Sequence, residues 1–254
     1  MNLAGSSAVV TGAASGLGAA VCEALAAAGV HVLGLDLAAS IERSAVAGSV
    51  RLVAADVTSA DEVASALEHL NPAAPLRLAV NCAGIAPASR ILGSRGPHDL
   101  DLFRRVIDVN LVGSFNVLRL AAARMARHDP EPGDRDGQRG VIINTASIAA
   151  YEGQIGQVAY AASKGAVVSM TLAAARDLAR HGIRINTIAP GVVETPMLAG
   201  LGEGVSDVLA EAVPFPERLA RPAEFARLVT MIAEHDYLNG ETIRMDGALR
   251  MGPR

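Results

Sequence analysis

Residues 8–18 read AVVTGAASGLG, and this stretch decides the fold that the sequence predicts. A short apolar run leads into a turn with glycine at positions 12, 16 and 18, and an alanine-rich segment follows. Glycine suits such a turn because the backbone must bend tightly and approach a pyrophosphate closely. The start of the following helix would offer free N–H groups and a favourable dipole to the phosphates. The stretch predicts a phosphate-binding turn, although its GxxxGxG spacing alone also fits a plain strand-to-helix turn.

Apolar runs and alanine-rich segments alternate along the rest of the chain. The runs are continuously apolar, which favours strands that are buried on both faces. Strands that alternate with helices predict a parallel, doubly wound sheet. We therefore expect a single α/β Rossmann domain over residues 1–254, with about seven strands and helices on both faces. Further strands are predicted at 30–35, 50–55, 76–80, 141–145, 183–188 and 242–245, and helices at 17–28, 61–70, 99–127 and 157–180.

Two irregular stretches interrupt this alternation. Residues 128–140 (HDPEPGDRDGQRG) are polar and contain proline and glycine, so they predict a surface insertion. Residues 190–216 form a long stretch with glycine and proline at intervals, which predicts a substrate lid. Its part at 192–201 (VVETPMLAGL) is apolar and suits an acyl or steroid body.

The overall composition argues against several classes of function. The net charge of −4 disfavours a general nucleic-acid binder. No segment approaches 18 consecutive apolar residues, so no membrane span is expected. Two cysteines are too few for a disulfide framework, which favours reduced thiols and a cytoplasmic location. The six histidines show no metal-ligand spacing, and no metal is expected.

Asp36 ends the second predicted strand, well placed after the glycine turn to select the cofactor. A carboxylate there can accept both hydroxyls of the adenosine ribose of NAD and would repel the 2′-phosphate of NADP. Neither Ser15 nor Leu37 supplies a cation that would offset this repulsion, so we expect NAD. The end of the third predicted strand, at 56–57, is placed to meet the adenine edge. If no cofactor binds there, Asp36 is an ordinary helix cap or a solvated strand end, and Asp56 is an ordinary strand end.

Tyr160 and Lys164 lie four residues apart on a predicted helix, and Lys164 is the only lysine of the chain. Their spacing places both side chains on one helix face, one turn apart. A nearby ammonium is expected to lower the pKa of a phenol from about 10, because it favours phenolate. The pair therefore predicts a general acid/base that works near neutral pH. The alternative is an unrelated tyrosine beside a solvated lysine.

Together with further motifs, these residues resemble the short-chain dehydrogenase/reductase family. The resemblance covers essentially the whole chain, and the motifs match in order and spacing. One motif departs from the family pattern: Cys82 stands where the commoner NNAG has asparagine, at a place that presents mainly its backbone to the cofactor. The matching motifs are TGxxxGxG at 11–18, NCAG at 81–84, Asn110, Ser147, Tyr160 to Lys164, and Pro190-Gly191.

The chain is also similar to one subgroup of that family, the type-2 3-hydroxyacyl-CoA dehydrogenases. The similarity lies in VIINTAS (141–147), EGQIGQ (152–157), VPFP (213–216), MDGALRM (245–251) and the polar insertion. It implies reversible, NAD-dependent oxidation of a short or 2-methyl-branched 3-hydroxyacyl-CoA to the 3-oxoacyl-CoA. Oxidation of a hydroxysteroid or another lipophilic secondary alcohol is the alternative. A 3-oxoacyl-carrier-protein reductase usually prefers NADPH, and a non-catalytic nucleotide sensor usually lacks the tyrosine or the lysine.

The resemblance implies a role for each site residue. Tyr160 takes the hydroxyl proton of the substrate, Lys164 holds the phenolate and contacts the nicotinamide ribose, and Ser147 hydrogen-bonds the substrate oxygen. Asn110 anchors a water relay to Lys164, or is simply a helix asparagine packed against backbone. The implied cofactor-binding residues are Gly12, Ser15, Gly16, Leu17, Gly18, Asp36, Asp56, Val57, Cys82, Tyr160, Lys164, Val193 and Thr195.

The resemblance further implies a homotetramer, with the helix at 157–180 in one interface and the C-terminal tail near another. Apolar helix faces fit either a subunit contact or a core. The expected partners are thus a small-molecule substrate and further copies of the chain, without nucleic acid or membrane.

Overall fold

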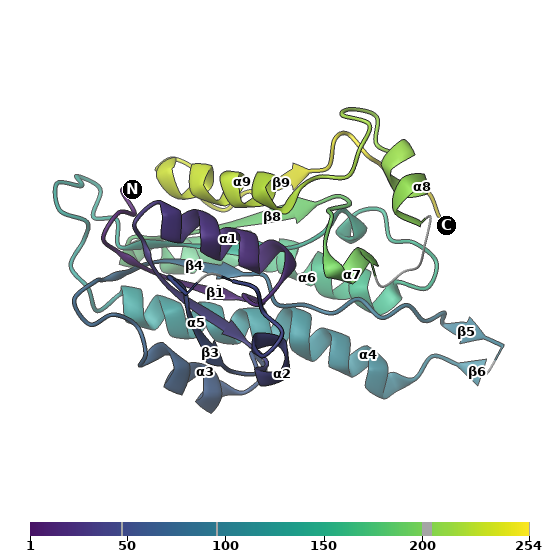
Figure 1. Ribbon diagram of the computed structural model, residues 1–254, viewed down its shortest axis with the longest axis horizontal. Helices are drawn as coiled ribbons and strands as arrows, with labels where there is room; N and C mark the ends of the chain where they lie inside the picture. The colour runs from purple at the N-terminus through teal and green to yellow at the C-terminus, as the bar shows by residue number, and fades with distance from the viewer. Residues whose placement is uncertain (47, 95, 200–204, 254) are drawn as a thin grey trace.

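A seven-stranded sheet forms the centre of the computed structural model, which describes residues 1–46, 48–94, 96–199 and 205–253 (Figure 1). All seven strands run parallel, in the order β3-β2-β1-β4-β7-β8-β9. Each forms within two residues of its predicted bounds, which confirms the expected doubly wound sheet. The strands are β1 (Ser7–Thr11), β2 (His31–Asp36), β3 (Arg51–Ala54), β4 (Leu76–Asn81), β7 (Gly140–Thr145), β8 (Ile183–Pro190) and β9 (Thr242–Met245).

The direction of winding reverses between β1 and β4. Thr11, the last residue of β1, lies opposite Leu35 of β2 on one side and Asn81 of β4 on the other. At such a switch point the connections leave the sheet in opposite directions, and a crevice opens beyond the carboxyl ends of the strands. The fold itself therefore locates the site.

Helices cover both faces of the sheet (Figure 1). Neighbouring residues of a strand point to opposite faces, so Val10 and Ile143 pack in the core beneath the helices of one face, and Val9 and Ile142 in the core of the other. The helices of the first face are α1 (Gly16–Ala27) and α9 (Pro222–Glu234). Those of the second are α3 (Ala60–Leu67), α4 (Leu100–Ile107), α5 (Ser114–Met125) and α6 (Val158–Leu178).

The predicted helix at 99–127 forms, but its middle turn is wider than an α-helix. A π-helical segment, η1 (Asp108–Gly113), joins α4 to α5. Gly113 packs there against Val57, and a Cβ on this glycine would lie 2.6 Å from the Val57 side chain. Such π-helical turns occur frequently at functional sites, and this one carries Asn110.

Several elements were absent from the sequence prediction. The largest is α9, whose start carries Pro222 at its first turn and Glu224 bonded back to the Arg221 backbone. Both are recognisable start signals. The other additions are short: α2 (Ala38–Ile41), the hairpin of β5 (Leu92–Gly93) and β6 (Gly96–Pro97), η2 (Ile148–Ala150), α7 (Pro196–Ala199) and α8 (Val205–Glu211). A short turn, η3 (Ala179–His181), ends the predicted helix at 157–180. The hairpin projects beyond the body of the molecule (Figure 1).

The two irregular stretches lie at opposite ends of the strands. The insertion at 128–140 runs over the surface, where Arg77 donates to the carbonyl oxygens of Asp129 and Arg139 at 2.8 and 2.9 Å. The expected lid begins within β8 and continues as α7 and α8 beside the site. Its residues 200–204 lie outside the described part of the chain.

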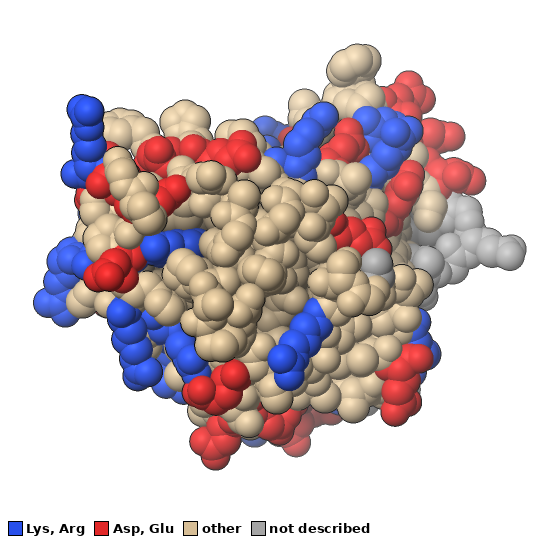
Figure 2. Space-filling model, turned by 60° about the vertical axis from the view of Figure 1, so that its left-hand side comes forward, with Lys and Arg blue, Asp and Glu red and all other residues tan. Residues whose placement is uncertain are grey.

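The surface mixes both signs of charge. On the face shown in Figure 2, basic and acidic side chains are scattered around the margin, and uncharged residues fill most of the centre. Two helical stretches, Leu100–Met125 and Val158–His181, are long and apolar enough to cross a membrane by length and composition alone. Core helices pass the same test, and both stretches pack on the sheet here.

Candidate active site

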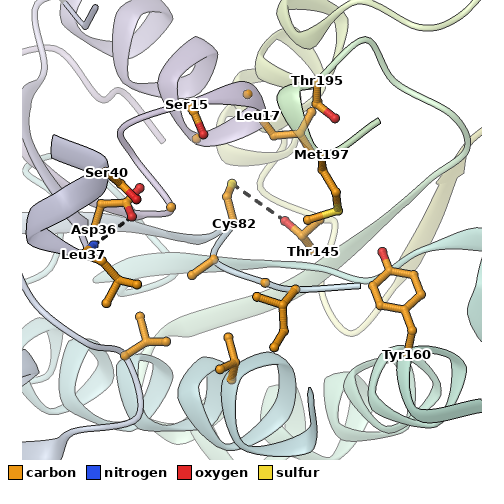
Figure 3. A pocket seen from close by; sticks show the side chains of 18 of the residues that line it. Ser15, Leu17, Asp36, Leu37, Ser40, Cys82, Thr145, Tyr160, Thr195 and Met197 are labelled. Carbon is orange, nitrogen blue, oxygen red and sulfur yellow. Dashed lines mark hydrogen bonds between the residues drawn. The ribbon is translucent and has the colours of Figure 1, made fainter. Parts of the chain in front are cut away.

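A cavity of about 800 Å³ opens at the carboxyl ends of the central strands (Figure 3). It is lined by every residue predicted to bind the cofactor, and also by Ser147. Asn110 is the one predicted site residue outside the lining. Asp36 lies at one end of the cavity and Tyr160 at the other, so the cofactor-selecting and catalytic groups face a shared elongated space (Figure 3).

The glycine turn leaves no room for side chains. Gly12 has a φ of +63°, and a Cβ there would lie 2.9 Å from the backbone nitrogen of Ala83. A Cβ on Gly18 would collide with the Gly12 carbonyl oxygen. Thr11 Oγ1 accepts hydrogen bonds from the N–H groups of Cys82 and Ala83, both at 3.1 Å, and so ties the turn to the loop after β4. This close backbone cradle fits a dinucleotide pyrophosphate.

Asp36 is held in place by backbone donors. Its two carboxylate oxygens accept from the N–H groups of Ala14 and Leu37, at 2.9 and 2.8 Å. The carboxylate therefore faces the cavity from a fixed position beside Ser40, as the ribose-binding prediction requires (Figure 3). Its oxygens retain further lone pairs for a ribose hydroxyl.

The third strand end is a more ordinary feature. Asp56 also lines the cavity, but its Oδ1 accepts from the N–H and hydroxyl of Thr58, at 2.9 and 2.8 Å. The Val57 carbonyl accepts from Asn116 Nδ2 at 2.8 Å. Asp56 thus stabilises its own turn, and its contact with an adenine edge stays a prediction.

Ser147, Tyr160 and Lys164 come together at the far end of the cavity. Ser147 precedes η2, where its Oγ accepts from the Ala149 N–H at 3.1 Å, and it also hydrogen-bonds Tyr160. Lys164 Nζ lies 5.7 Å from the centroid of the Tyr160 ring and donates to the Thr145 carbonyl at 2.7 Å. The predicted one-turn spacing therefore brings hydroxyl, phenol and amine into one cluster.

Burial dominates the titration of this cluster. It raises the pKa of Tyr160, and the hydrogen bond with Ser147 opposes the rise. It lowers the pKa of Lys164 to about 8 and raises that of Cys82 to about 12. The predicted lowering of the Tyr160 pKa is therefore wrong for this structure. The sequence pattern placed an ammonium near the phenol but gave no measure of how burial disfavours the charged forms of both groups.

Asn110 is fully buried beside the cavity and serves the loop after β4. Its Oδ1 accepts from the Ile85 N–H at 2.8 Å, and its Nδ2 donates to the Ile85 carbonyl and to Ser163 Oγ, at 2.9 and 3.0 Å. A Cβ on Gly84 would lie 3.2 Å from Asn110 Oδ1 and 3.6 Å from Lys164 Nζ. Asn110 thus packs against backbone, and the water relay to Lys164 stays a prediction.

The segment predicted as a lid lies beside the start of α1. Val193 is buried and forms an isolated bridge with Ala220, and a Cβ on Gly16 would lie 3.4 Å from the Thr195 side chain. Both residues line the cavity as predicted. Met197, in the stretch expected to suit an acyl or steroid body, also lines the cavity, whereas a charged row on α4 and the start of η1 was not predicted. The row consists of Asp101, Arg104, Arg105 and Asp108, whose three- and four-residue spacing marks one helix face.

Comparisons with known proteins agree with this geometry. Residues 6–206 match the family model described as short chain dehydrogenase. The chain is 52% identical over 252 residues to human 3-hydroxyacyl-CoA dehydrogenase type-2, covering 97% of this chain and 95% of that protein. The Drosophila melanogaster protein of the same name is 51% identical over 251 residues, covering 96% of this chain and 97% of that protein.

A solved structure gives the same result. The crystal structure of 3-hydroxyacyl-CoA dehydrogenase type-2 from Mycobacterium avium has a TM-score of 0.90 and 44% identity, and 98% of each chain is covered. The fold, the catalytic cluster and these relatives agree with one another. The chain therefore belongs to the short-chain dehydrogenase family and is an oxidoreductase that acts on a CH–OH group.

Proposed function

We propose that this protein catalyses the reversible, NAD-dependent oxidation of a 3-hydroxyacyl-CoA, with a short or 2-methyl-branched acyl chain, to the 3-oxoacyl-CoA. The observation that carries the proposal is the cluster of Ser147, Tyr160 and Lys164 in the cavity that also contains Asp36. The names of the relatives supply the substrate class.

The residues of the cavity divide the chemistry among them. A bound NAD would supply the hydride acceptor. Tyr160, as phenolate, takes the proton of the substrate hydroxyl. The C3–H bond breaks with its electron pair, and the oxygen becomes a carbonyl. Ser147 donates a hydrogen bond to that oxygen and stabilises the charge that develops on it, while the Lys164 ammonium favours the phenolate.

The preference for NAD rests on Asp36. Its fixed carboxylate lies at the end of the cavity remote from Tyr160 (Figure 3) and would repel a 2′-phosphate. Arg104 and Arg105 line the same cavity, and either would offset this repulsion if it reached the ribose. Initial rates with NAD and NADP side by side test the choice, and equal kcat/KM for both would contradict it.

A hydroxysteroid or another lipophilic secondary alcohol is the second candidate substrate. It is favoured by the apolar residues that line the cavity from the lid, Val193, Pro196 and Met197. A substrate panel separates the candidates by the rise in NADH absorbance. Turnover of 3-hydroxybutyryl-CoA or 3-hydroxy-2-methylbutyryl-CoA supports the first proposal. Turnover of a hydroxysteroid alone supports the second, and no turnover of either class would favour a nucleotide sensor.

We further propose a homotetramer in the cytoplasm. Helix α6 exposes Leu172, and the neighbouring η1 and α5 expose Val112 and Phe115, each by more than 40%. These exposed apolar side chains on one helix layer would be covered in a subunit contact. The cytoplasmic location is supported by Cys22 and Cys82, which are both free thiols. Light scattering after gel filtration measures the assembly.

A further inference from the structure

An ion-pair cluster lies behind the catalytic loop, outside the residues that line the cavity. Arg244 of β9 forms a two-pronged pair with Glu152, with N–O distances of 2.8 and 2.9 Å, and a third bond of 2.6 Å with Asp246. Arg250 adds a bond of 3.0 Å to Asp246 and lies 3.7 Å from Glu152. Two cations and two anions therefore balance one another.

The cluster joins two parts of the chain that are far apart in the sequence, the loop after Ser147 and the C-terminal stretch from β9 into the tail. Glu152 follows η2, the turn that begins directly after Ser147. Arg244 belongs to the edge strand of the sheet, and Asp246 and Arg250 belong to the C-terminal tail. The Arg244 guanidinium also lies 5.1 Å from the centroid of the Tyr151 ring. Arg244 therefore contacts two adjacent residues of this loop, Tyr151 and Glu152.

Apolar packing and a backbone hydrogen bond also join the loop after Ser147 to the C-terminal tail. Ile148 and Leu249 form a small buried cluster with Val213, against which Val192 packs. Val192 lies between Gly191 and Val193, which both line the cavity. Further along, the Ile155 N–H donates to the Pro253 carbonyl at 3.0 Å. The tail thus supports the whole segment from Ser147 to the start of α6, which carries Tyr160.

We infer that Arg244 is a positioning residue for the reaction, and the inference rests on the proposed roles of Ser147 and Tyr160. Through Glu152 it fixes the 148–157 segment and thereby the position of Ser147 Oγ relative to the Tyr160 hydroxyl. A rigid two-pronged pair suits this task because its geometry restricts direction as well as distance. Arg244 itself is not among the residues that line the cavity.

The test uses Arg244→Met, Arg244→Lys and Glu152→Gln in the full-length enzyme. Each is expected to lower kcat by about 10–100-fold, because displacement of a catalytic group by about 1 Å costs that much. The Kd for NAD, measured by isothermal titration, should change less than about twofold. Arg244→Lys keeps the charge but loses the fork, so a full rescue by lysine would contradict the positioning role.

The matched control is Arg218→Met. Arg218 forms an equally short two-pronged pair with Glu224, both bonds being 2.8 Å, but within one local segment. Its loss should leave kcat unchanged. If Arg218→Met lowers kcat as much as Arg244→Met, the effect is general and the inference is wrong.

A double-mutant cycle separates positioning from mere stability. If Arg244 acts through Ser147, then Arg244→Met in a Ser147→Ala background should cost less than about threefold more than Ser147→Ala alone. Additive losses would overturn the inference. Hydrogen exchange of residues 148–157 is the second readout. Exchange should accelerate in Arg244→Met whether or not the chosen substrate turns over. A wrong substrate can therefore be told apart from a wrong positioning role.

Discussion

At the scale of single residues, Tyr160 and Ser147 set the pH dependence of the reaction. Burial raises the Tyr160 pKa, so the phenolate that oxidation needs becomes more abundant as pH rises, and the phenol that reduction needs becomes scarcer. We expect kcat/KM for alcohol oxidation to rise through the alkaline range and that for ketone reduction to fall. Ser147→Ala removes the hydrogen bond that lowers this pKa, so its rising limb should shift to higher pH.

The measurement is a pair of pH–rate profiles, for the wild type and for Ser147→Ala. A rising limb that stays in place or moves to lower pH in the variant would contradict the assignment. Tyr160→Phe serves as the control, because it should reduce turnover by about 10²-fold or more at every pH.

Lys164, a predicted catalytic residue, lowers the free energy of unfolding. Its pKa falls from 10.5 to about 8 on folding because the buried ammonium is disfavoured. Below pH 8 the buried Lys164 is charged and lowers the free energy of unfolding by the full amount. This loss of stability disappears as the pH rises from the folded pKa to the unfolded pKa. Lys164 therefore destabilises the fold at neutral pH. Lys164→Met should therefore abolish turnover and raise the free energy of unfolding at pH 7 by about 1–2 kcal/mol.

Urea denaturation at a series of pH values checks this expectation. The gain of the variant over the wild type should shrink from pH 8 upward. A variant that is less stable than the wild type at pH 7 would show that the Thr145 hydrogen bond outweighs the burial of the charge.

At the scale of elements, the glycine turn offers a matched pair of substitutions. Gly12 and Gly29 both have positive φ, +63° and +78°, where alanine costs about 1 kcal/mol. Only at Gly12 would a Cβ collide with neighbouring backbone. Gly29→Ala should lower stability alone, whereas Gly12→Ala should also weaken NAD binding by about tenfold or more.

Isothermal titration with NAD and thermal denaturation measure the two effects. Equal NAD affinity in both variants would mean that the close approach of Gly12 to the loop after β4 does not shape the phosphate site.

The elements also show how far the sequence could lead. Continuous apolar runs predicted all seven strands, because a buried parallel strand must be apolar on both faces. Pro222 and Glu224 are typical of a helix start, so α9 could also have been predicted from the sequence. The π-helical turn at Asn110 left no recognisable pattern, because it depends on how Gly113 packs against a strand end.

The sequence predicted which residues form the site more fully than it predicted their pKa values and ion pairs. Local motifs predicted many of the residues that line the cavity, because most of these motifs follow strand ends that the fold brings together, but they gave no sign of the charged row at 101–108. They did not predict the raised pKa of Tyr160, which depends on burial by the whole fold. Nor did they predict the pair of Arg244 and Glu152, whose partners are separated by 92 residues.

At the scale of the whole molecule, the exposed apolar side chain of Phe115 tests the proposed assembly. It is half exposed in the single chain, on the helix layer that includes α6. Phe115→Arg should dissociate the tetramer, because a charge at a buried subunit contact would be unpaired. Val208→Arg is the control, since Val208 is more exposed and lies on α8. Light scattering that gives equal mass for wild type and Phe115→Arg would exclude this face.

The single lysine has a consequence for chemical labelling. Besides the α-amino group, Lys164 carries the only primary amine of the chain, and it lines the cavity with a pKa of about 8. A substantial part of it is an uncharged nucleophile at mildly alkaline pH. A small acylating reagent that enters the cavity would therefore mark one functional amine per chain, and protection by NAD would report occupancy of the site without any substrate.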